Sequence, residues 1–124
     1  MLFKIRPPTP SDRAFVAANW SRGARKFYRG VGVDEYDAGF DDLINATLRT
    51  ADVSMLCDPD DDDELFGFVV HEGANRLHWI HVKGLFRRMG FAKRALTELF
   101  GDRELVSRWP CELGRKVRWN PFTF

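Results

Sequence analysis

Apolar and polar positions follow two periods along this chain, and the two periods predict strands and helices respectively. Residues 2–6 alternate apolar and polar side chains, as a half-buried strand does. Short apolar runs rich in β-forming residues predict four further strands, at 53–57, 65–71, 76–82 and 104–108. The tail from 114 to 124 is expected to add a short strand whose aromatic side chains pack back against the sheet.

Three segments carry apolar side chains at intervals of three and four residues, which is the spacing of an amphipathic helix. The first is predicted over 10–20, with Thr9 as its N-cap and Pro10 at its first position. Asp12 is placed to face its unpaired N–H groups. The second is predicted over 34–51. A third begins near Gly90 and stops at Gly101.

Three connections between these elements have distinct compositions. Residues 21–33 combine glycines with arginines and a lysine, which predicts a mobile basic loop able to meet a ligand. Residues 58–64 are almost all acidic, and such a run is too repulsive to be buried, so an exposed hairpin turn is expected. It lacks the spacing and the central glycine of a calcium-binding loop. Residues 72–75 predict the turn of a second hairpin.

Length and charge narrow the possible functions. A chain of 124 residues with 44% hydrophobic side chains fits one domain with a real core. Its net charge of +1 argues against the strongly cationic surface that non-specific nucleic-acid binding needs. Cys57 and Cys111 stand apart without metal-ligand spacing, so no metal site is expected. A single disulfide between them is open, and reduced thiols are the simpler interpretation. With no signal-peptide pattern and no long apolar segment, we expect a cytoplasmic protein that does not enter the membrane.

The junction between the strand at 76–82 and the last helix carries the most specific pattern. Arg87-x-x-Gly90-x-Ala92 places small residues where the backbone of a strand-to-helix turn can approach a phosphate. Free N–H groups at a helix start attract anions, and Arg87, Arg88 and Lys93 add positive charge. The same pattern also occurs as a plain turn with solvated arginines, so its setting in the fold must decide.

The order strand, helix, helix, three strands, helix, strand and tail resembles the GNAT superfamily of acyl-CoA-dependent N-acetyltransferases. The resemblance rests on VKGLFRRMGFAKRAL at residues 82–96 and on IRPPTPSD at residues 5–12. It implies an α/β (α+β) fold with a mixed, mostly antiparallel central sheet flanked by helices. It also implies a single domain that transfers an acetyl group from acetyl-CoA to a primary amine on a small molecule or a protein.

The resemblance further implies which residues hold the coenzyme. Main-chain N–H groups of residues 88–93 would hold the pyrophosphate, and the backbone of residues 80–82 would pair with the pantetheine arm. The residues implied in coenzyme binding are Ile80, His81, Val82, Arg87, Arg88, Met89, Gly90, Phe91, Ala92 and Lys93.

Proton transfer has few candidates. His78 and His81 are expected on opposite faces of their strand, so that only one of them faces the cleft, and a structural role is open for both. Glu35 lies at the start of the second helix, where it either meets substrate or simply favours the helix start. Glu72 is expected to be a solvated turn residue and a minor candidate.

The sequence departs from the family pattern after the fifth strand. Family members often place a tyrosine acid for the leaving thiolate there, whereas Tyr28 and Tyr36 both precede the coenzyme motif. A thiolate can leave without a strong acid. The short tail is expected to leave one side of the cleft open, which a homodimer partner would cover. The alternatives are an acetyltransferase-fold interaction module without turnover and, against the charge balance, a nucleic-acid-modifying relative.

Overall fold

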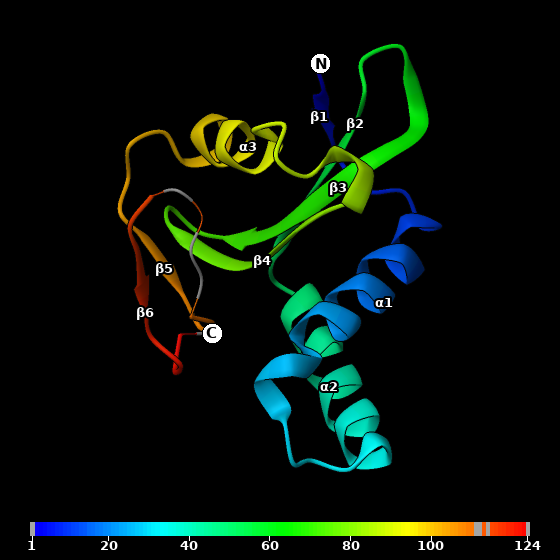
Figure 1. The fold of residues 1–124 in the computed structure, drawn as a ribbon, viewed down its shortest axis with the longest axis vertical. Helices are drawn as coiled ribbons and strands as arrows, with labels where there is room; N and C mark the ends of the chain where they lie inside the picture. Colours follow the sequence, from blue (N-terminus) through cyan, green and yellow to red (C-terminus); the bar gives the residue numbers. More distant parts are fainter. Residues whose placement is uncertain (1, 111–112, 114, 124) are drawn as a thin grey trace.

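A six-stranded sheet with helices on both sides forms the molecule. The computed structural model describes residues 2–110, 113 and 115–123. The strands lie side by side in chain order: β1 (Lys4–Arg6), β2 (Asp52–Asp58), β3 (Asp61–Glu72), β4 (Arg76–Val82), β5 (Leu105–Ser107) and β6 (Val117–Trp119). The helices are α1 (Asp12–Ala24), α2 (Val33–Leu48) and α3 (Phe91–Phe100), with short 3₁₀ helices η1 (Arg25–Tyr28) and η2 (Gly84–Phe86). α3 covers one face of the sheet, and α1 and α2 lie against the other (Figure 1).

The sheet is mixed. β1 to β4 pair antiparallel, whereas β4 with β5 and β5 with β6 pair parallel. The parallel pairing follows from the chain path, because α3 carries the chain over the sheet between β4 and β5. The predicted mixed, mostly antiparallel sheet and the predicted element order are confirmed.

The sheet separates two apolar cores. On the face of α1 and α2, Trp20 and Phe40 pack edge to face with ring centroids 6.0 Å apart, and both are buried with Phe68 of β3. On the α3 face, Phe66 stacks on Phe91 at 5.3 Å. Large aromatic side chains contribute most of the area removed from water in a domain of this size, so these two layers hold the helices on the sheet.

The predicted mobile loop over 21–33 is wrong for most of its length. α1 continues to Ala24 and η1 follows directly, so only residues 29–32 lie outside helices. A glycine occupies position 23 of the helix because α1 lies close against β4: a Cβ atom there would come within 2.7 Å of the Trp79 ring. The packing of α1 on the sheet therefore accounts for the glycine that suggested a loop.

The predicted helix ends shift by a few residues elsewhere. α1 begins at Asp12 rather than Pro10, and Asp12 accepts from Arg6 (2.7 Å) and from the Thr9 N–H (2.8 Å) instead of capping the helix. α2 ends at Leu48 rather than at residue 51. Asp61 to Glu64 belong to β3, so the turn itself is only two residues long, although the carboxylates of residues 60–64 are exposed as predicted.

The tail forms the predicted strand, β6, but two of its aromatic side chains do not pack back. Trp119 is 59% exposed and Phe122 82% exposed. Cys57 is a buried free thiol, whereas Cys111 lies outside the described residues. Within the described part of the chain, no group of three or more His, Cys, Asp and Glu side chains is placed to hold a metal ion. Among the same residues, no helix has the length and apolar character needed to cross a membrane.

Candidate active site

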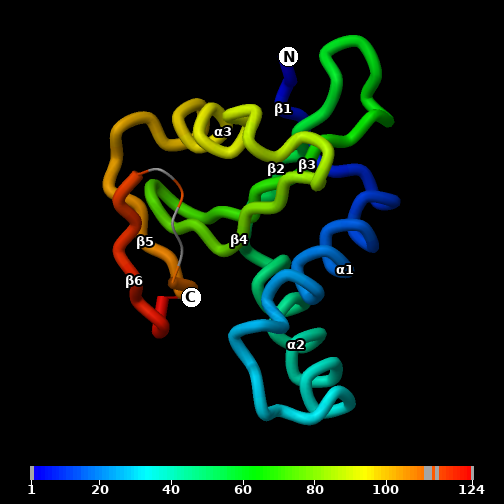
Figure 2. The backbone as a smooth tube through the Cα atoms, viewed as in Figure 1, coloured from blue at the N-terminus to red at the C-terminus, as the bar shows by residue number. Residues whose placement is uncertain are grey.

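β4 and β5 pair over only two residues and then separate, which opens a pocket between them. The paired positions are Arg76 with Val106 and Leu77 with Ser107, at the hairpin end of β4 (Figure 2). Beyond them lies a pocket of about 380 Å³. It is lined by Lys26, Phe27, Leu77, His78, Trp79, Ile80, Ser107, Trp109, Pro110 and Leu113. The edge of β4 that faces this pocket is therefore open to an extended ligand. The backbone of residues 80–82, for which pairing with a pantetheine arm was predicted, belongs to this strand.

A bulge in β4 determines which side chains face the pocket. Val70 of β3 pairs with Trp79, and His71 pairs with Leu77. His78 is therefore an extra residue in β4 that has no partner residue in β3. The bulge interrupts the alternation of side chains. Leu77 packs in the core beneath α3, and Trp79 packs in the core beneath α1 and α2.

The prediction that His78 and His81 lie on opposite faces is wrong because of this bulge. The His81 ring contacts Phe15 of α1 at a centroid distance of 6.1 Å. His78 bonds to Glu72. Glu72 also interacts with the hydroxyl of Thr50, which follows α2 and helps to lower the pKa of Glu72. Both histidines therefore lie on the face of α1 and α2.

His78 is buried and pairs with Glu72, which is half-buried. Its Nε2 lies 2.9 Å from Glu72 Oε1, and the imidazole is 1% exposed. Burial lowers the pKa of His78, while the Glu72 carboxylate opposes that shift. The His78 contact in turn lowers the pKa of Glu72. A neutral imidazole whose Nε2–H donates to the carboxylate keeps Nδ1 as the atom that accepts a proton. Glu72 is thus not the solvated turn residue that was expected.

Two buried polar atoms of pocket residues lack partners. His78 Nδ1 and Trp109 Nε1 are both buried without a hydrogen-bond partner in the described part of the structure. Such atoms are uncommon because leaving a buried polar group unpaired costs about 1–3 kcal/mol. One acceptor nitrogen and one N–H donor in the same pocket fit a ligand that satisfies both.

His81 has a different environment. It is half-buried between Phe15 and Phe68, and it does not line the pocket. Burial is the main reason its pKa is lowered, and the charges of Arg87, Arg22 and Lys83 add to the shift. Its cationic surroundings favour the neutral ring, but the pocket geometry favours His78 for proton transfer.

The turn from β4 into α3 has the backbone geometry that the glycine pattern suggested. Gly90 immediately precedes α3 with φ of +77°, and Arg88 has φ of +65°. Both conformations lie in the left-handed region, which glycine adopts readily and other residues at a cost. The Arg87 side chain turns back, and its Nε donates to the Val82 carbonyl (3.0 Å). Arg87 thereby ties the turn to the end of β4.

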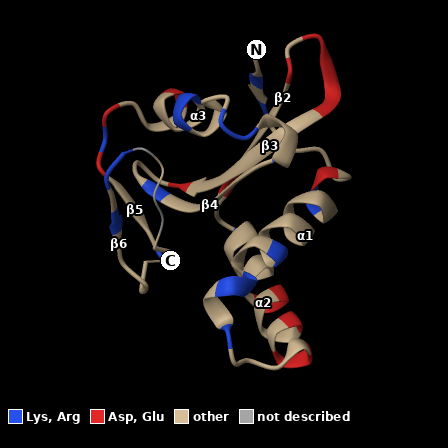
Figure 3. Cartoon of the chain, in the orientation of Figure 1, with Lys and Arg blue, Asp and Glu red and all other residues tan. Residues whose placement is uncertain are grey.

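The start of α3 presents unpaired N–H groups. The N–H of Arg94 donates to the Gly90 carbonyl (3.0 Å), and no side chain caps the helix. Within the described residues, the N–H groups of Phe91, Ala92 and Lys93 have no acceptor, as expected for a first turn. Lys and Arg residues gather on α3 and the turn before it, while acidic residues mark the β2–β3 hairpin and α2 (Figure 3). This end of α3 therefore suits an anion.

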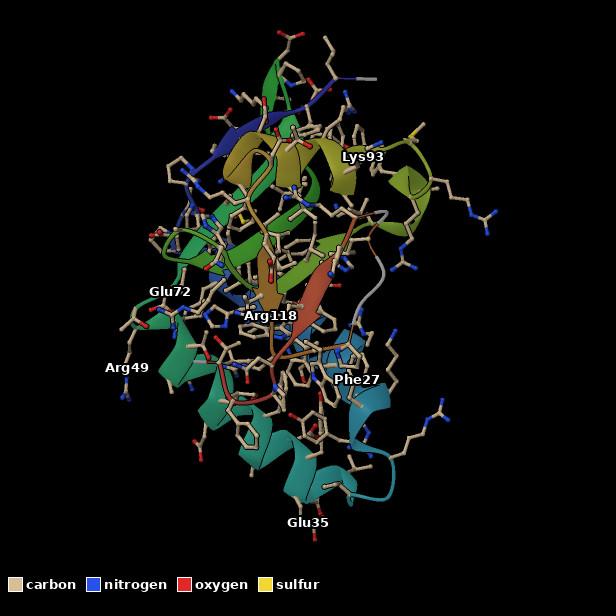
Figure 4. All side chains as sticks on the ribbon, turned by 90° about the vertical axis from the view of Figure 1, so that its left-hand side faces the viewer. Phe27, Glu35, Arg49, Glu72, Lys93 and Arg118 are labelled. Carbon is tan, nitrogen blue, oxygen red and sulfur yellow. The ribbon has the colours of Figure 1, made fainter. Side chains whose placement is uncertain are left out.

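Glu35 lies far from both features. It is exposed near the start of α2, at the opposite end of the molecule from Lys93 (Figure 4). It does not line the pocket between β4 and β5. Of its two predicted roles, the position supports the one in favouring the helix start, because Glu35 is the third residue after the N-cap Gly32.

Sequence reasoning missed most of the pocket wall. Phe27 was placed in a mobile loop, Trp79 and Ser107 were seen only as strand residues, and Trp109 was placed in no element. The aromatic content of 14% was a signal, but nothing in the spacing showed that rings from η1, β4 and the segment after β5 meet.

Comparison with known structures defines the class of fold. YjaB from Escherichia coli, solved in solution in its apo form, aligns with a TM-score of 0.54 and 20% identity, covering 79% of this chain and 67% of that one. A GCN5-related N-acetyltransferase from Rhodopseudomonas palustris aligns at 0.52 and 18%, covering 82% and 69%. A GNAT-family acetyltransferase from Staphylococcus aureus aligns at 0.51 and 12%, covering 79% and 64%.

The fold is thus that of the GNAT-family acetyltransferases, as the sequence predicted. The identities are low and the chain spans about two thirds of these structures, so the likeness concerns the fold and not a particular reaction. No protein-family model matches the sequence, and no curated protein matches it either.

Proposed function

We propose that this protein is an N-acetyltransferase that transfers an acetyl group from acetyl-CoA to a primary amine. The observation that carries the proposal is the combination of two sites on one strand. β4 borders the pocket where it separates from β5. The chain then continues from β4 into the start of α3, where an anion would bind. A donor with a phosphate at one end and an extended arm at the other fits both sites together.

The chain's own groups supply binding and orientation. The N–H groups of residues 91–93 hold the pyrophosphate, with Lys93 adding charge, and Gly90 keeps the approach open. The open edge of residues 80–82 pairs with the pantetheine arm, which places the thioester in the pocket. Holding the thioester and the amine together makes their reaction effectively intramolecular.

Proton transfer falls to His78. The amine nitrogen bonds to the acetyl carbon, the carbon–sulfur bond breaks, and the thiolate leaves. The proton lost by the amine passes to Nδ1 of His78, directly or through one water, while Glu72 holds Nε2 and stabilises the imidazolium that forms. The indole N–H of Trp109 is the pocket's unpaired donor for the developing oxyanion.

Replacing Gly90 by alanine tests the donor site. A Cβ atom at Gly90 meets no described atom within 4 Å, so the added methyl stands in the space that the phosphate needs. We expect calorimetric affinity for acetyl-CoA to fall by about tenfold or more, because the methyl blocks the approach of the phosphate. The left-handed backbone costs a side chain about 1–2 kcal/mol, which lowers the stability of the fold.

Gly101→Ala is the matched control. Gly101 also has positive φ (+59°) and ends the same helix at the opposite side from the phosphate site. It should lower the melting temperature like Gly90→Ala while leaving acetyl-CoA affinity unchanged. Equal affinity losses in the two variants, or no binding by the wild type, would refute the proposed donor site. Binding without thiol release across a panel of amines would favour an interaction module instead.

A further inference from the structure

Three aromatic rings form one wall of the pocket between β4 and β5. Phe27 comes from η1, Trp79 from β4, and Trp109 from the segment after β5. The Phe27 and Trp109 rings are stacked at 5.4 Å, and Trp79 meets them edge to face at 6.3 Å and 5.9 Å. Figure 4 shows Phe27 on η1, beside the sheet.

Packing holds this wall rigid. Trp109 is only 6% exposed, and its ring also contacts Tyr28 and Phe40. Trp79 lies directly against Gly23 of α1, where any side chain would clash with it. Rings fixed in this way lose little further conformational entropy when a ligand arrives.

The ammonium group of Lys26 already lies over one ring of the wall, that of Phe27. The ammonium of Lys26 lies 5.3 Å from the centroid of Phe27, and Lys26 itself lines the pocket. A bound cation such as a second ammonium of a polyamine would meet this charge instead of a bare ring face. The wall therefore favours a flat, uncharged group over a cationic one.

We propose that the acceptor is an arylalkylamine, a primary amine joined by a short saturated linker to a single aromatic ring. This assignment rests on the proposed acetyl transfer, since it places the ring against Phe27, Trp79 and Trp109 and the amine beside His78. The pocket volume of about 380 Å³ lies near the lower end for small-molecule sites and must also admit the thioester, so one ring fits better than a fused pair.

Matched amines test the assignment. Thiol release from acetyl-CoA is measured with phenethylamine, with its saturated-ring counterpart cyclohexylethylamine, and with putrescine. We expect kcat/KM for phenethylamine to exceed the other two by about tenfold, because only the aromatic ring makes ring-to-ring contacts with the wall and putrescine carries a second charge. Equal rates with the two ring amines, or a preference for putrescine, would overturn the assignment.

A variant of the wall supplies the second arm. Phe27→Leu keeps an apolar side chain but removes the ring, and should bring the two ring amines to within about threefold of each other. Phe122→Leu, at an 82% exposed aromatic residue outside the pocket, should leave the preference intact. An undiminished preference in Phe27→Leu would count against the wall as the acceptor site.

Direct binding separates this assignment from the proposed reaction. Calorimetric titration of the free protein with phenethylamine and with cyclohexylethylamine needs neither acetyl-CoA nor turnover. Failure of acetyl-CoA to bind sinks the proposed function alone, while a preference for phenethylamine in the titration still supports the acceptor assignment. Acetyl-CoA binding and turnover with no preference for the aromatic ring in either assay sinks the acceptor assignment alone.

Discussion

One extra residue in β4 changes the chemistry of the pocket. Without the bulge, His78 would follow the strict alternation of a strand and face away from Trp79 and His81. With it, His78 borders the pocket and reaches Glu72 at the end of β3, beside the turn of the β3–β4 hairpin. An imidazole and a carboxylate six positions apart become an acid–base pair.

Replacing His78 or Glu72 should change activity in different ways. His78→Gln should reduce thiol release by about a hundredfold or more, the usual contribution of a general base. The rate of the wild type should fall as pH drops through the pKa of His78, since only the neutral ring accepts a proton. Glu72 raises that pKa, so Glu72→Gln should move the acidic limb to lower pH.

His71→Gln provides the control for this pH profile. His71 is a half-buried histidine whose pKa is also lowered by burial, but it bonds to Ser54 and contacts Phe100 on the α3 face. Its replacement should leave the limb in place. An acidic limb that does not move in Glu72→Gln would argue against His78 as the base, even if the rate falls.

At the scale of elements, two glycines within helices distinguish the effect of side-chain packing on stability from the effect of helix propensity. Gly23 in α1 lies against Trp79, with 2.7 Å left for a Cβ atom, whereas Gly39 in α2 has no described atom within 4 Å. Gly23→Ala should destabilise the fold by about 1–3 kcal/mol through overpacking. Gly39→Ala should stabilise it by about 0.5–1 kcal/mol, because alanine favours helix.

Urea unfolding of the two variants measures this difference. Opposite shifts of the midpoint are expected, with similar slopes. Stabilisation by both substitutions would mean that α1 does not press on β4 as described. Because Trp79 lines the pocket, Gly23→Ala should also weaken amine binding, while Gly39→Ala should not.

For the whole molecule, the histidines make stability depend on pH. Burial lowers the pKa of all three, His71, His78 and His81, below the ordinary value of the unfolded chain. The unfolded chain therefore binds protons first as pH falls. Their contribution to stability is complete above about pH 6.5 and is lost as pH drops through the lower pKa values of the folded state.

Unfolding midpoints in urea between about pH 7.5 and about pH 5.5 test this dependence. The midpoint should fall over this range, and His71→Gln should make the fall shallower. Asp12 and Glu72, whose pKa values are held low by Arg6 and His78 respectively, lose their contribution only at lower pH. A midpoint that stays constant would contradict the burial of these rings.

Local patterns in the sequence were enough to predict the order of elements. The strand at 76–82 and the stop of α3 at Gly101 were predicted as they occur, because side-chain alternation and positive φ are properties of short segments. The helical state of residues 21–28 was not predicted, because a glycine in the sequence indicates a break in a helix. The structural reason for Gly23 is the Trp79 ring beside it, which the sequence does not reveal.

The sequence by itself determined the order of elements and the glycine turn before α3, since both depend on periodicity and on one glycine next to a helix, and the resemblance of residues 82–96 and 5–12 to a known family pointed to the type of fold. Only the tertiary structure decided which side chains share the pocket. The register between β3 and β4 produces the bulge at His78, and the packing of η1 and the segment after β5 brings Phe27 and Trp109 to the same wall. These contacts join residues distant in the chain, and no local pattern specifies which of them become neighbours.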